Sequence, residues 1–140
     1  MSQSKSAILN RSDVPSRDAL HEAIKELEFK LSVDESYVPF ESSGYLPCTL
    51  NGEDGGLNVR FDAAEPYVTQ FPALKDHTGQ RDTLITLRSG GDPREEVCVL
   101  MLAAVLAEKF GAIVHDPKKD ALSAADKLIG QARSQFAELD

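Results

Sequence analysis

Residues 97–109 of this chain are apolar on nearly every side of a helix, and this segment constrains the fold more than any other. Asp92 is a good N-cap before it, Pro93 suits the first helical position, and Glu95 completes a capping box. Gly111 is placed to end the helix. A helix without a polar side must be covered all round, so we expect this one at the centre of the protein.

Two further segments have the pattern of an amphipathic helix. The first begins after Ser16, a good N-cap, and has an apolar side chain at every third or fourth position as far as Leu31. The second opens at Ser123 with Asp126 and carries a similar stripe, although Gly130 weakens this helix. Each segment is therefore predicted to turn one face towards a core.

Short strand patterns lie between these helices. Residues 46–50 and residues 57–61 flank a glycine-rich turn and predict a β-hairpin. Residues 83–87 are rich in β-branched side chains, and residues 112–115 follow the central helix as a short strand. Residues 7–9 are expected to add a strand near the start of the chain.

The predicted order of elements is β-α-β-β-β-α-β-α, which indicates an α+β fold. We expect a small, mostly antiparallel sheet with about three helices packed mainly on one face. A chain of 140 residues suits one domain, so residues 7–140 are predicted to form a single α+β domain. Residues 1–6 are polar and are predicted to be a disordered tail.

The chain has 23 acidic and 15 basic residues, a formal net charge of −8 at pH 7. This surplus opposes binding to nucleic acid or anionic membranes and favours a basic partner, although the charge could serve solubility alone. Cys48 and Cys98 are too few for a disulfide framework, so we expect two buried thiols. Neither a signal sequence nor a membrane-length apolar run is visible, which predicts a cytoplasmic protein.

No motif points to catalysis, so we predict that the protein is not an enzyme and holds no metal or cofactor. Residues 89–91 lack the lysine of a phosphate-binding loop, and Asp92 would repel a phosphate there. The histidines have no metal-ligand spacing, and no nucleophile elbow is present. A small enzyme with a dispersed site at His115, Asp116 or His77 stays open as an alternative.

Acidic and aromatic residues near the hairpin are the best candidates for a partner-binding surface. Glu53 and Asp54 lie at its predicted tip, and Asp62, Glu65 and Tyr67 follow its second strand. Aromatic side chains anchor interfaces while charges steer the approach, so we predict that these residues contact a partner. The alternative is a solvated hairpin whose charges prevent pairing between sheet edges.

Residues 43–61 contain the hairpin, and residues 81–95 form a strand that runs into the capped helix. Together they resemble immunity proteins of bacterial polymorphic-toxin and type VI secretion effector–immunity pairs. The resemblance implies a cytosolic protein that binds a cognate toxin or effector domain, such as a nuclease, and neutralises it by occluding its active site.

Two alternative functions accompany this expectation. An effector-loading chaperone or adaptor of a secretion system would also be acidic and non-catalytic, but it would engage an unfolded segment through an exposed apolar groove. A small enzyme with a dispersed site would instead need a cleft that contains titratable side chains. Association into a homo-oligomer is compatible with each of the three.

Overall fold

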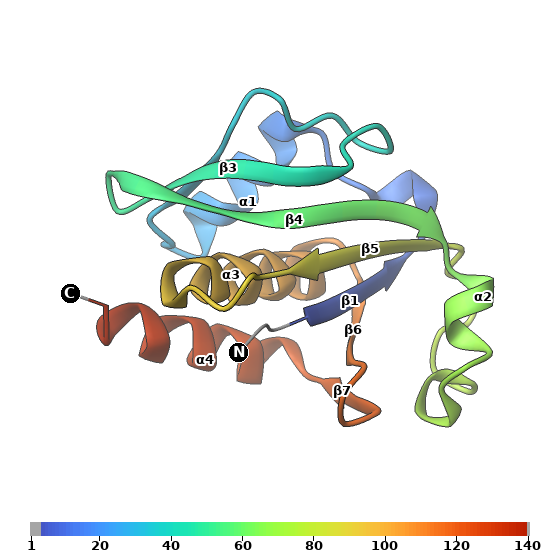
Figure 1. Cartoon of the computed structure of the whole chain (residues 1–140). Helices are drawn as coiled ribbons and strands as arrows, with labels where there is room; N and C mark the ends of the chain where they lie inside the picture. Colours follow the sequence, from blue (N-terminus) through green and yellow to red (C-terminus); the bar gives the residue numbers. More distant parts are fainter. Residues whose placement is uncertain (1–3, 140) are drawn as a thin grey trace.

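The computed structural model describes residues 4–139 and confirms the predicted α+β fold. Within these residues, seven strands form one antiparallel sheet in the order β2-β3-β4-β5-β1-β6-β7 (Figure 1). The strands are β1 (Ser4–Leu9), β2 (Leu31–Val33), β3 (Gly44–Leu50), β4 (Glu53–Ala63), β5 (Thr83–Arg88), β6 (Ile113–Asp116) and β7 (Ala121–Ser123). The helices are α1 (Arg17–Glu26), α2 (Glu65–Val68), α3 (Pro93–Lys109) and α4 (Ala125–Ala137), with 3₁₀ turns η1 (Arg11–Asp13) and η2 (Pro72–Leu74).

The helix α3 is the centre of the molecule, as its composition predicts. Every side chain from Val97 to Leu106 is buried. α3 packs on β4, β1 and β5, while α1 and α4 pack against α3 (Figure 1). The three long helices therefore lie on one side of the sheet, and they leave most of its other face without a helix.

The predicted ends of α3 are confirmed, with one difference in the capping. The Asp92 carboxylate accepts a hydrogen bond from the Arg94 amide at 2.7 Å, and Gly111 follows the helix with a φ of 70°. Glu95 does not close a capping box. Its carboxylate accepts from the Gly90 amide at 2.8 Å and so fixes the loop before the helix.

The face of the sheet towards α3 is apolar because alternate residues of each strand point to it. From β3 and β4 it receives Leu46, Cys48, Leu57 and Val59, all buried. Cys98 of α3 is also buried, and its neighbouring thiol, together with burial, raises the pKa of Cys48. The two thiols are not joined in a disulfide, as expected.

The prediction of a disordered tail is wrong for residues 4–6, which begin β1; residues 1–3 lie outside the described part of the chain. β1 pairs with β5 on one side and with β6 on the other. Lys5 is buried on the helix side, where its ammonium group pairs with Asp116 at 3.4 Å. Because this partner lies far along the chain, no local pattern could indicate the start of the strand.

The predicted six-residue turn of the hairpin is much shorter in the structure. Asn51 and Gly52 alone form it, with φ values of 53° and 81°, as a two-residue turn between β3 and β4. Glu53 and Asp54 are consequently the first residues of β4 and not part of a loop. The Arg94 guanidinium fixes this end by donating to the Leu50 carbonyl at 2.6 Å.

The two outermost strands, β2 and β7, have three residues each and escaped the sequence patterns. The outer edge of β2 is covered by side chains of α1. The Val33 amide donates to His21 Nε2 at 3.0 Å, and the Val33 carbonyl accepts from Arg17 at 3.0 and 3.1 Å. These bonds occupy backbone groups that would otherwise be free to pair with another chain. At the opposite edge, α4 begins after Ala124 and is not capped by Ser123.

Candidate functional site

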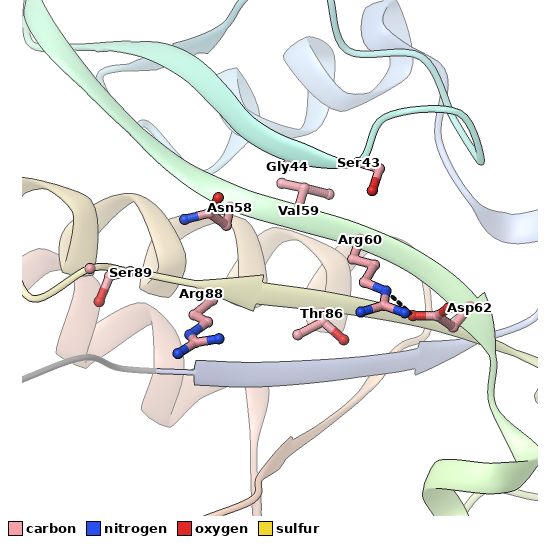
Figure 2. A pocket seen from close by; sticks show the side chains of 10 residues that line it. Ser43, Gly44, Asn58, Val59, Arg60, Asp62, Thr86, Arg88 and Ser89 are labelled. Carbon is pink, nitrogen blue, oxygen red and sulfur yellow. Dashed lines mark ion pairs between the residues drawn. The ribbon is translucent and has the colours of Figure 1, made fainter.

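The candidate site is the face of the sheet that the long helices leave uncovered. Its centre is a hollow of about 650 Å³ over β4 and β5 (Figure 2). The alternate residues of β4 that point away from α3 are Asn58, Arg60 and Asp62, and they meet Thr86 and Arg88 of β5. All but the half-buried Thr86 are exposed, so hydrogen-bonding groups of this face are open to a partner.

The strand register fixes how these side chains neighbour one another. Asn58 lies opposite Arg88, and Arg60 lies opposite Thr86, so the two arginines are diagonal neighbours. Diagonal residues of a sheet are about 7–8 Å apart, and their Cβ atoms are somewhat closer. Arg60 pairs with Asp62 in the same strand at 3.1 Å (Figure 2). Within residues 4–139, the guanidinium of Arg88 has neither an ion-pair nor a hydrogen-bond partner.

Two loops border the hollow, and one of them precedes a helix, as a phosphate-binding loop does. Ser43 and Gly44 lie on the β3 side, and Ser89 and Gly90 lie between β5 and α3. The Gly90 amide already donates to Glu95, and Asp92 caps α3. The loop amide and helix end that a phosphate would use are therefore occupied by carboxylates, in agreement with the structural role expected for this loop.

α2 and η2 cover the far end of the same face. Tyr67 and Phe71 pack there over Ile8 and Leu84, which belong to a second, smaller core. This short cover leaves the part of the face formed by β2, β3, β4 and β5 open. Burial raises the pKa of Tyr67, which holds its hydroxyl in the neutral form over a wider pH range.

His115 is an anchor beneath that cover and is completely buried. Its Nε2 lies 2.8 Å from a carboxylate oxygen of Asp120, and its Nδ1 lies 2.6 Å from the Tyr67 hydroxyl. Because a carboxylate only accepts, Nε2 carries a proton, and in a neutral ring Nδ1 accepts from Tyr67. The His115 side chain is therefore closed off from solvent in the described part of the chain, and both of its ring nitrogens have partners inside the protein.

The five residues predicted to bind a partner do not form one patch. Glu53 and Asp54 lie at one end of β4, whereas Asp62 and Glu65 lie at the other, about 27 Å away along an extended strand. Glu53 pairs with Arg94 at 3.6 Å. Asp62 alone lines the hollow, and Tyr67 is half-buried against His115. Their role in binding stays a prediction.

The sequence alone does not predict three residues of the site, Arg60, Arg88 and Thr86. The alternation of Asn58 and Arg60 with apolar residues does indicate a solvent-facing side of β4. What the alternation cannot indicate is that β5 lies beside β4 in a register that brings the two arginines together. That neighbourhood depends on strand pairing, which has no local signature here.

The described residues form no cluster of three or more His, Cys, Asp or Glu side chains suited to a metal ion. Among residues 4–139, no helix is both long enough and apolar enough to cross a membrane. No family model, curated protein or solved structure matches the chain. The resemblance of residues 43–61 and 81–95 to immunity proteins therefore stays a hypothesis.

Proposed function

We propose that this protein is a cytoplasmic immunity protein, which binds a cognate secreted toxin domain and neutralises it by occluding the toxin's active site. The open face of the sheet, as defined by Asn58, Arg60, Asp62, Thr86 and Arg88, is the docking surface in this proposal. The observation that carries it is the polar hollow of about 650 Å³ on that face. Neutralisation of this kind requires binding alone and no chemistry by the immunity protein.

The arrangement of the helices supports a role in binding. α3 covers the apolar side of the sheet, so the part of the opposite side that α2 and η2 leave open is not needed to close the main core. Most side chains over the hollow are exposed and carry amide, hydroxyl, guanidinium or carboxylate groups. Such groups give specificity at an interface, and a sheet holds them at fixed spacing.

The same surface favours a folded partner over the client of an effector-loading adaptor. An adaptor that holds an unfolded apolar segment needs an apolar groove, whereas this hollow is lined mainly by polar residues. Among the described residues, the exposed large hydrophobic side chains are Val38, Tyr45 and Leu122, which lie in a loop, in β3 and in β7. They are dispersed and do not build a groove.

The immunity proposal is tested by capture followed by a survival assay. The tagged chain is purified from its native host, and the protein that co-purifies in stoichiometric amount is identified. We expect that this partner, expressed alone in the cytoplasm of a sensitive strain, arrests growth and that co-expression of this chain restores it. A captured partner that is not toxic contradicts the proposal. If secretion of that partner fails when this chain is absent, the chain is an adaptor instead.

The predicted acidic contribution is tested separately with the captured partner. Asp54→Lys reverses an exposed charge and leaves the Glu53–Arg94 pair in place. If acids at the hairpin end steer a basic partner, association slows and becomes less dependent on salt, while dissociation changes little. Glu138→Lys, an exposed change beyond the end of α4, is the matched control. Equal association rates for the two variants would remove the hairpin end from the interface.

A further inference from the structure

The open face carries a local charge opposite to that of the whole chain. Two arginines, Arg60 and Arg88, line the hollow, whereas the net charge of the chain is −8. Of the described residues that line the hollow, only Asp62 is acidic. The surplus of acidic residues therefore lies outside the hollow, and the centre of the open face is positive.

The register makes these arginines a pair with a preferred ligand. As diagonal neighbours on β4 and β5, the two arginines are about 7–8 Å apart at the sheet and bring like charges to the same part of the face, which is unfavourable. An anion placed between them is attracted by both and removes this repulsion. The planar guanidinium group suits a carboxylate, which it binds through two parallel hydrogen bonds.

Both guanidinium groups are available to such a ligand. The side chain of Arg60 is 71% exposed and that of its partner Asp62 is 39% exposed, and an ion pair open to water stabilises a protein only weakly. Arg60 can therefore turn towards an incoming carboxylate at little cost. Arg88 has no partner to give up within the described residues.

We propose that the open face docks an acidic surface segment of the partner protein and that Arg60 and Arg88 bind one of its carboxylates between them. Asn58 and Thr86 lie opposite the two arginines and offer amide and hydroxyl groups to the same segment. A net charge of −8 opposes polyanions such as nucleic acid, so a single carboxylate on a protein fits this surface better than a chain of phosphates. This inference rests on the proposed function in one respect only, namely that the partner is a toxin.

A peptide titration tests the carboxylate anchor without the partner. The probe is a short peptide of alternating threonine and glutamate, added at millimolar concentration to isotope-labelled protein. We expect the backbone amide resonances of Asn58, Arg60, Thr86 and Arg88 to shift, and we expect peptides with glutamine or lysine in place of glutamate to leave them unchanged. No shift with the glutamate peptide, or equal shifts with the glutamine peptide, overturns the inference.

Two double variants identify the groups responsible. Arg60→Gln with Arg88→Gln should weaken the binding of the glutamate peptide at least about tenfold. Lys25→Gln with Lys127→Gln removes the same charge from exposed positions on α1 and α4 and should keep the affinity. Equal weakening by both variants would show a general charge effect. Inorganic phosphate that shifts the same amides more strongly than the peptide would overturn the choice of a protein carboxylate.

The survival assay then separates this inference from the proposed function. If the captured partner is toxic, the arginine double variant should fail to restore growth and the lysine double variant should restore it. Peptide binding together with a non-toxic partner would retain the carboxylate anchor and reject the immunity function. A toxic partner that the arginine double variant still neutralises would retain the immunity function and reject the anchor.

Discussion

On the side of β4 that packs against α3, the residues are Leu57 and Val59, which are buried; on the other side, the same strand carries Asn58 and Arg60, which are exposed. Adjacent residues of one strand thus serve two different purposes. The covered face excludes water and holds the fold together, while the open face contributes little to the core. Its side chains are free to be selected for contact with a partner.

The largest expected effect comes from the covered face. Leu102→Ala removes part of a nearly buried side chain from α3 and should lower the free energy of unfolding by about 2–5 kcal/mol. Urea denaturation measures this change. Leu122→Ala in β7, where the side chain is 37% exposed, is the control and should cost far less. A loss below about 1 kcal/mol at Leu102 would mean that the core does not depend on this contact.

The covered face is also the part of the fold that sequence predicts well. A fully apolar helix and an alternating hairpin have local signatures, and α3 and the hairpin strands were found from them. The start of β1 at Ser4 was not predicted, because Lys5 is stabilised by a partner far along the chain, Asp116. The arginine pair also depends on a register between strands separated by α2 and η2, and no spacing along the chain encodes it.

The next effect concerns the place where α2 and η2 cover the open face. Tyr67→Phe removes the hydroxyl that bonds the buried His115 and leaves a ring nitrogen without a partner, at a cost of about 1–3 kcal/mol. Tyr45→Phe is a matched control, since its hydroxyl donates to the Gly55 carbonyl at 3.0 Å from an exposed side chain that water can replace. Equal losses in urea denaturation would show that Tyr67 is not an anchor.

A smaller effect is expected at the edge of the sheet, where α1 covers β2. Burial and the nearby Arg17 charge lower the pKa of His21 below 6.5, and its neutral Nε2 accepts from the Val33 amide. Because the unfolded chain binds this proton more readily, the contribution of His21 is present above pH 6.5 and is lost as the pH falls below that value. Unfolding in urea at a series of pH values measures this loss.

The matched variants for that experiment are His21→Gln and His77→Gln. Glutamine at position 21 keeps an acceptor that does not titrate, so this part of the pH dependence should disappear. His77 is exposed and lies outside the sheet, so its replacement should leave the dependence due to His21 unchanged. A pH dependence unaltered by His21→Gln would assign it to another group.

The smallest effect on stability is expected on the open face. Arg88→Gln should change the free energy of unfolding by no more than about 0.5 kcal/mol, because its guanidinium is exposed and has no partner within residues 4–139. A slight gain is the expected sign, since the change removes a charge that lies beside Arg60. A loss above about 1 kcal/mol would instead make Arg88 part of the structure. The covered and open faces would then no longer differ in their contribution to stability. Side chains on which the fold depends cannot be selected for contact with a partner alone.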